Sequence, residues 1–196
     1  LRRRLAATSV TSDTTGLAAV DFVTLLDLAR GISAGSPHIA ARRAVSDAVV
    51  LAATRRLLAE RPGVFGPVAD HPSVERTVMA AHRNLREVHP DALDRLSDIG
   101  GSLSDLVGLH RALVERLQPT FHDEHERAVV AAARIADGSV DLPPIVLYLP
   151  GTLVASERRL VGALATAGRL TAVVGDADGP DGSVSADPDL AALTET

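Results

Sequence analysis

A continuous apolar run late in the chain, PPIVLYLPG at residues 143–151, restricts the fold more than any other stretch. Its five apolar residues, Ile145–Leu149, stand between a Pro-Pro pair and a Pro-Gly pair. Short apolar runs between turn residues are typical of strands, and a run without polar alternation favours a strand that is covered on both faces. The sequence therefore predicts a strand at 145–149 in a sheet with both faces covered.

A second apolar run, Leu170–Val174, follows a segment with helical spacing. In VASERRLVGALATAG, residues 154–168, the side chains of Leu160, Val161 and Leu164 fall on one side of a helix. A strand, a helix of about 14 residues and another strand form the pattern of a parallel βαβ unit. We expect the two apolar runs to be adjacent parallel strands.

The residues before the first run predict a series of helices. Aromatic residues make up only 2% of the chain, so Ala, Leu and Val must supply the core. The expected helices span Thr24–Gly31, Ile39–Glu60, 74–88, Asp91–Ile99, 103–117 and about 123–136, and a short strand is expected near Val20. The expected N-caps are Thr24, Ser73, either Ser102 or Ser104, and either Thr120 or Asp123.

These elements predict a predominantly helical α/β chain in which a helical insertion interrupts a small parallel sheet. We expect residues 1–37 to begin the α/β domain as a strand and a helix, and residues 38–140 to form an insertion of four or five helices. Residues 141–178 are expected to return as strand, helix and strand. Residues 179–196, rich in Gly, Asp, Pro and Ser, are expected to be a disordered linker or tail. Because the chain begins with Leu, we expect it to be a piece of a longer polypeptide.

The overall composition narrows the class of protein. The chain has no cysteine, which excludes a disulfide framework and a thiolate metal site and is compatible with the cytoplasm, where we expect the protein. No apolar run approaches the roughly 20 residues that span a bilayer, and the first residues lack the apolar segment of a signal peptide. The formal net charge of -5 opposes nucleic-acid binding by this chain alone.

The segment HDEHE, His122–Glu126, is a candidate metal site. On a helix, His122 and His125 would reach one cation, with Asp123 or Glu126 as a third ligand. Acidic residues in a first helical turn also complement the positive end of the helix dipole. We favour this second interpretation, because no distant Cys or His pair completes a zinc signature. The other histidines are expected to be structural or at the surface: His38, His71, His82, His89 and His110.

Nucleotide-binding motifs are missing from the sequence. A GxxxxGK[ST] loop needs a lysine, and all 20 basic residues are arginine; GxGxxG is absent as well. In P-loop proteins an apolar strand that ends in Asp holds Mg²⁺, whereas Ile145–Leu149 is followed by Pro150-Gly151. Ser156-Glu157 stands where α/β enzymes place functional loops, but we favour a cap for the following helix.

Four stretches together carry a family resemblance. They are VDFVTLLDLARGI, RRLLAERPGVFGPVADHPSVERTVMAAHRNLREV, LSDLVGLHRALVERLQPTFHDEHE and PPIVLYLPGTLVASERRLVGALATAGRLTAVVG. In this order, residues 17–178 resemble the N-terminal helicase-like domain of AddB/RecB-like subunits of bacterial helicase-nucleases, the actinobacterial PD-(D/E)XK nuclease family proteins. The last stretch is similar to the strand, helix and strand that carry a degenerate Walker B motif in that family.

The resemblance implies a non-catalytic scaffold segment, with a superfamily 1 helicase-like sheet, of an ATP-dependent DNA helicase-nuclease subunit that acts in double-strand break repair and recombination. It implies a helicase partner subunit and contact with DNA through the complex, with no membrane role. ATP and Mg²⁺ belong to the parent family, whose P-loop would precede Leu1 and whose nuclease domain would follow Thr196. By analogy Thr24 is a candidate DNA contact, and no catalytic, cofactor-binding or metal-binding residue is carried over.

Two alternatives stay open at this point. The first is a helical protein-interaction or regulatory module without a nucleic-acid role, in which the apolar stripes of 74–88 and 103–117 form a partner surface. The second is a small hydrolase or metal enzyme that uses His122, His125 and Glu126.

Overall fold

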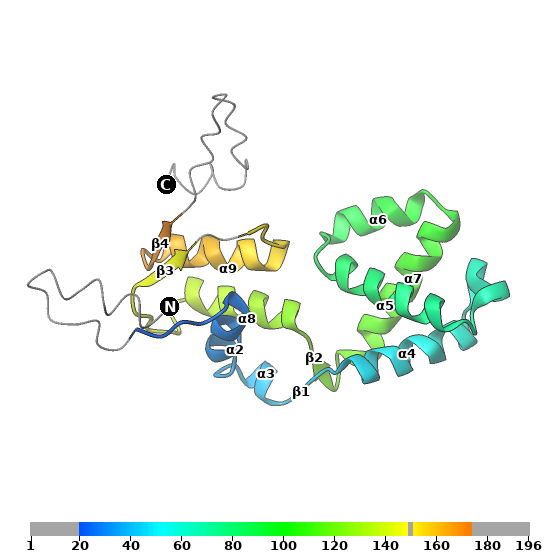
Figure 1. Ribbon diagram of the computed structural model, residues 1–196, viewed down its shortest axis with the longest axis horizontal. Helices are drawn as coiled ribbons and strands as arrows, with labels where there is room; N and C mark the ends of the chain where they lie inside the picture. Colours follow the sequence, from blue (N-terminus) through cyan, green and yellow to red (C-terminus); the bar gives the residue numbers. More distant parts are fainter. Residues whose placement is uncertain (1–19, 149–150, 174–196) are drawn as a thin grey trace, which may run out of the picture.

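The computed structural model describes residues 20–148 and 151–173, and it is mostly helical with two short parallel strand pairs (Figure 1). The helices are α2 (Leu25–Ser33), α3 (Pro37–Ala40), α4 (Asp47–Glu60), the 3-10 helix η2 (Gly63–Val68), α5 (Pro72–Arg86), α6 (Pro90–Asp98), α7 (Gly101–Leu117), α8 (Glu124–Ala136) and α9 (Ala155–Thr166). The strands are β1 (Arg43–Ala44), β2 (Phe121–His122), β3 (Ile145–Tyr148) and β4 (Leu170–Val173).

The predicted parallel βαβ unit is confirmed. β3 and β4 pair in parallel, from Ile145 opposite Leu170 to Tyr148 opposite Val173, and α9 is the crossover between them. The predicted strand ends at Leu149 and Val174 lie outside the described residues, as does the expected tail at 179–196.

The prediction that both faces of this sheet are covered is wrong for the described residues. Ile145 and Leu170 pack against the core that α8 and α9 share, so one face is covered. On the other face Val146 is 64% exposed and Tyr148 is 66% exposed. The apolar run therefore supplies one partly buried row and one exposed row of side chains.

One hydrophobic core lies between α2, α8 and α9. Figure 1 shows α8 running beneath α9 with α2 below it, and α8 packs extensively on both. Ala128 and Ala131 of α8 are buried there, and their small side chains let the neighbouring helices approach closely. Leu160 and Leu164 of α9 complete this core, so α8 positions the crossover helix and with it the sheet. We call α2, α8, α9, β3 and β4 the base unit.

A second core lies within α4, η2, α5, α6 and α7, which we call the helical unit. Leu58 of α4, Val78 of α5 and Leu113 of α7 are buried together, and α6 packs on α7. The apolar stripes of 74–88 and 103–117 contribute to this core, because Val78, Leu109 and Leu113 are buried in it. These positions are therefore not available as a partner surface.

The two units meet where β1 pairs in parallel with β2, Arg43 opposite Phe121 and Ala44 opposite His122. The chain enters the helical unit after β1 and leaves it before β2. α8 lies inside the expected insertion of residues 38–140 yet shares its core with α2 and α9. Judged by which core each helix packs in, the part of the chain that interrupts the base unit is the helical unit, without α8.

Local capping explains where several helices begin. Thr24 accepts a hydrogen bond from the Asp27 backbone N–H at 3.1 Å, and Asp123 accepts one from Glu126 at 2.8 Å, so both predicted caps are confirmed. The Ser73 cap is wrong, because the ring of His71 accepts from the Ser73 N–H instead. Gly100, with a φ of 81°, precedes α7 in place of Ser102 or Ser104.

Three further boundaries differ from the prediction. The helix expected from Ile39 begins at Asp47, because Ser46 caps it and the residues before it form α3 and β1. α2 continues past Gly31 to Ser33. Among the described residues, the strand expected near Val20 is not formed, and residues 20–24 lead into α2 without regular secondary structure.

Replacing Leu164, which is fully buried in the base unit, by Ala is expected to lower the free energy of unfolding by about 2–5 kcal/mol, because it leaves a cavity between α8 and α9. The matched control is Ile99→Ala at an exposed position, which is expected to change stability by less than about 0.5 kcal/mol. Urea unfolding followed by circular dichroism measures both. Equal effects of the two changes would contradict the assignment of this core.

Candidate functional site

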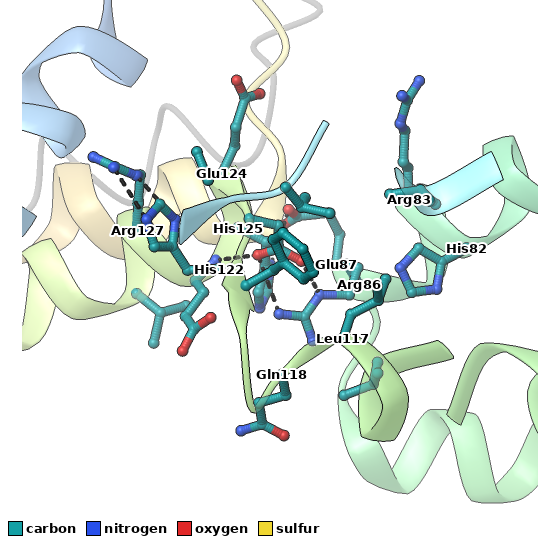
Figure 2. Close-up of a pocket in the computed structure, with 18 of the residues that line it drawn as sticks. His82, Arg83, Arg86, Glu87, Leu117, Gln118, His122, Glu124, His125 and Arg127 are labelled. Carbon is teal, nitrogen blue, oxygen red and sulfur yellow. Dashed lines mark hydrogen bonds and ion pairs between the residues drawn. The ribbon is translucent and has the colours of Figure 1, made fainter. Parts of the chain in front are cut away.

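A cavity of about 830 Å³ lies between the two units (Figure 2). Its walls come from α4, α5 and the end of α7 on one side, and from the segment Phe121–Arg127 and Arg30 on the other. The volume is in the range of small-molecule pockets. Charged side chains crowd the walls, and the contacts that they make decide what the cavity can do.

Arg86, the last residue of α5, is paired with Asp123, the cap of α8. The Arg86 Nε donates to Asp123 Oδ2 at 2.6 Å and its Nη2 donates to Oδ1 at 3.2 Å. Burial disfavours the charged carboxylate, but the hydrogen bonds from Arg86 and from the Glu126 N–H outweigh it, so the pKa of Asp123 lies below its usual value. Asp123 is therefore ionised and fully engaged, and it joins α5 to α8.

Glu87 follows directly and joins α5 to both α8 and α9. Its Oε2 accepts from the Ser156 backbone N–H at 2.8 Å, and its Oε1 lies 3.0 Å from both Ser156 Oγ and His125 Nδ1. Burial opposes ionisation, but the Ser156 N–H and His125 outweigh it, so the pKa of Glu87 is also lowered. Ser156 is the second residue of α9, where a helix has backbone N–H groups without internal partners. The Glu87 carboxylate, at the end of α5, thus accepts a hydrogen bond from a backbone N–H that has no partner within α9.

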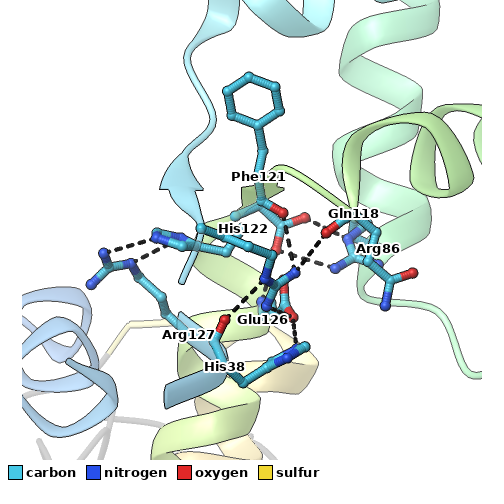
Figure 3. Close-up of polar contacts among 9 residues, drawn as sticks. His38, Arg86, Gln118, Phe121, His122, Glu126 and Arg127 are labelled. Carbon is cyan, nitrogen blue, oxygen red and sulfur yellow. Dashed lines mark hydrogen bonds and ion pairs between the residues drawn. The ribbon is translucent and has the colours of Figure 1, made fainter. Parts of the chain in front are cut away.

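A buried ion pair stands beside β1 and β2. The Arg42 side chain is only 7% exposed, and its Nη2 lies 2.5 Å from Glu126 Oε1. Arg42 Nη1 also donates to the carbonyl oxygens of Gln118 and Phe121, at 3.0 and 3.2 Å. Figure 3 shows His38 approaching the same Glu126 carboxylate, with a distance of 2.8 Å from Nε2 to Oε1. The pair holds the end of α7 and the start of α8 near the strand crossing.

The three residues of the candidate metal cluster face different partners. His122 is buried in β2, where its ring contacts the Arg127 guanidinium at 3.2 Å. Burial is the main cause that lowers the pKa of His122, and the positive charge of Arg127 lowers it further. His125 contacts Glu87, and Glu126 contacts Arg42 and His38. Within residues 20–148 and 151–173, no group of three or more His, Cys, Asp or Glu side chains is arranged to hold a metal ion.

Two other positions singled out in the sequence have helix-capping contacts. The Thr24 hydroxyl donates to Asp27 at 2.7 Å, so an acidic side chain stands beside the candidate DNA contact. Glu157 accepts from the Val154 backbone N–H at 3.0 Å, which confirms the cap at the start of α9. Ser156 has the additional contact with Glu87, which the capping interpretation did not predict.

Two buried histidines form a pair beside the cavity. The rings of His82 on α5 and His110 on α7 have their centroids 4.9 Å apart, and the Nδ1 atom of each is buried without a hydrogen-bond partner. Burial lowers the pKa of both rings to about 4; the neighbouring Arg86 opposes protonation of both and Asp123 favours it. Both rings are therefore neutral at pH 7.

Most charged side chains of the cavity wall have a partner of opposite charge. Arg30 pairs with Glu124 within the base unit, Arg83 pairs with Asp47 within the helical unit, and Arg86 pairs with Asp123 across the contact. Arg127 contacts the ring of His122, whose pKa is lowered by burial and by Arg127 itself. Of these contacts, Arg86–Asp123 is the one that joins the two units. Sequence reasoning missed Arg42, Arg86 and Glu87, because their partners lie 37 to 84 positions away along the chain.

The fold and this contact region define a predominantly helical α/β chain made of a base unit and a helical unit. No protein-family model and no curated protein matches the sequence. In the part of the chain that the structure describes, no helix has the length and apolar character needed to cross a membrane.

Replacing Arg42 by Ala is expected to destabilise the chain by about 3–5 kcal/mol, because it leaves the largely buried Glu126 carboxylate without its main partner. Arg56→Ala is the matched control; its side chain is 76% exposed and pairs with Glu60, so the expected loss is below about 1 kcal/mol. Thermal unfolding of both variants measures the difference. A loss for Arg42→Ala no larger than for Arg56→Ala would show that the pair is not structural.

Acidification is expected to destabilise the folded chain through the histidine pair. The folded pKa of about 4 lies below the usual value near 6.5, so between these values the unfolded chain binds more protons. The free energy of unfolding should therefore decrease as the pH is lowered through this window, by up to about 1.4 kcal/mol per pH unit for each histidine. His110→Phe should flatten the slope, whereas His89→Asn, at an exposed capping position, should not. Urea midpoints from about pH 7.5 to about pH 5 test this, and an unchanged slope in His110→Phe would contradict it.

Proposed function

We propose that this chain is a non-catalytic scaffold segment of an ATP-dependent DNA helicase-nuclease subunit that acts in double-strand break repair and recombination. The observation that carries the proposal is the parallel pairing of β3 with β4 across α9. The family resemblance requires a strand, helix and strand at these residues, after a helical interruption, and the helical unit provides that interruption. The superfamily 1 helicase-like sheet and the cytoplasmic location belong to the same proposal.

The residues near the end of β3 do not fit ATP and Mg²⁺. The sequence after Tyr148 is Leu-Pro-Gly, which offers no carboxylate for the cation, and the chain has no lysine for a phosphate. The N-terminus of α9, where α/β proteins bind phosphate, faces the Glu87 carboxylate through the Ser156 N–H. A negative charge at this point repels a phosphate. Nucleotide hydrolysis is therefore assigned to other parts of the helicase-nuclease.

The open face of the β3–β4 sheet is the side on which the rest of the assembly would pack. Val146 and Tyr148 are exposed side by side on one strand, and Val173 is exposed opposite Tyr148. Two strands of four residues each are too few for an independent sheet, so further strands or a covering layer would stabilise them. This face supports a scaffold role better than the stripes of 74–88 and 103–117, whose residues Val78, Leu109 and Leu113 are buried in the second core.

Two measurements with the whole chain test the proposal. The chain alone is expected to release no phosphate from Mg-ATP, with or without linear duplex DNA. It is expected to bind the superfamily 1 helicase subunit of the same organism, and Tyr148→Ser should weaken that binding by about tenfold or more. Ile99→Ser, an equally exposed apolar position on the helical unit, is the control and should bind normally.

ATP hydrolysis by the chain alone, or no binding of the helicase subunit, would contradict the proposal. Binding that Tyr148→Ser leaves unchanged would refute the role of the open face. Binding to a protein outside DNA repair, without the helicase subunit, would favour the regulatory module instead.

A further inference from the structure

The two units contact each other through few residues. Each unit has its own core, and no helix of one unit packs extensively on a helix of the other within the described residues. The chain crosses between them at β1 and β2, which are two residues long and lie side by side. Figure 1 shows the helical unit extending beyond this crossing, away from α9. Short paired crossings of this kind concentrate any relative motion at a few backbone angles.

Away from the crossing, the end of α5 ties the units together. Arg86 reaches the cap of α8, and Glu87 reaches both His125 of α8 and Ser156 of α9. Glu87 contacts two elements of the base unit through three donors, all of them aimed at one carboxylate. Hydrogen bonds to an ionised acceptor are about twice as strong as neutral ones, so Glu87 is a strong tie beside the Arg86–Asp123 pair, and it is the one that reaches α9.

We propose that the Glu87 carboxylate is a latch that holds closed a hinge formed by β1 and β2. When the latch is released, the helical unit turns away from the base unit and the cavity between them opens. The inference concerns the motion of this chain and does not depend on its assignment to a helicase-nuclease.

The surroundings of Glu87 favour a releasable contact over a permanent one. Its side chain is 22% exposed, whereas Ser156 is 5% exposed, so water would reach the Ser156 N–H and Oγ once the hinge opens. The two hydrophobic cores do not include it, so each unit keeps its packing when the latch opens. The residues that line the cavity come from both units, so the cavity changes shape with the hinge.

Distances between two spin labels test the latch. The chain has no cysteine, so Ser102→Cys on α7 and Thr166→Cys on α9 give one exposed labelling site on each unit without background. In the otherwise unchanged chain we expect one narrow distance distribution. Glu87→Ala should broaden it and add longer distances, and Glu87→Gln should do so to a smaller extent. Glu60→Ala, which removes the ion pairs with Arg56 and Arg116 inside the helical unit, is the control and should leave the distribution narrow.

Hydrogen exchange separates latch opening from general unfolding. In Glu87→Gln the Ser156 amide should exchange about tenfold faster or more, while amides beside Leu113 and Leu164 in the two cores keep their rates. The proposal is overturned by a distance distribution in Glu87→Ala that matches the parent chain. It is also overturned if exchange in Glu87→Gln rises equally throughout both cores.

Discussion

The alanine face of α8 determines how the base unit is assembled. Ala128 and Ala131 are buried between α2 and α9, and at these positions a larger side chain would separate the helices. Because α9 is the crossover between β3 and β4, its position against α8 also fixes which face of the sheet is covered. Ile145 and Leu170 then fall on the covered side, and Val146 and Tyr148 fall on the open side. The orientation of the sheet thus follows from small residues in a helix that precedes it in the chain.

The same packing leaves polar groups at the contact with the helical unit. α8 uses its apolar residues against α2 and α9, so its first turn, with Asp123 and His125, faces α5. Contacts made of directed hydrogen bonds and ion pairs weaken quickly when their geometry changes, whereas apolar contacts tolerate sliding. Because each unit also has its own core, this polar contact region can be broken while the packing inside both units is kept.

The helices and one parallel strand pair could be predicted from the sequence, and the contacts between the helices could not. The helices from α5 to α9 and the caps Thr24 and Asp123 follow from apolar spacing and turn residues within about fifteen positions. The parallel pair β3–β4 follows from the order strand, helix, strand. Which helices share a core does not, because α8 has the same amphipathic pattern whichever partner it packs on. The candidate cluster His122–Glu126 was singled out for its spacing, but its contacts depend on Arg42 and Glu87, whose proximity only the fold creates.

The contact of Glu87 with α9 occupies a position where nucleotide-binding proteins bind phosphate, and it also holds the base unit against the helical unit. In an α/β protein that binds nucleotides, the first N–H groups of the helix after a strand are free to receive a phosphate. Here the Ser156 N–H and Oγ already serve a carboxylate from α5, and an incoming phosphate would have to displace that negative charge. The helix terminus therefore has the geometry of a phosphate site but contributes its hydrogen bonds to holding two parts of the chain together.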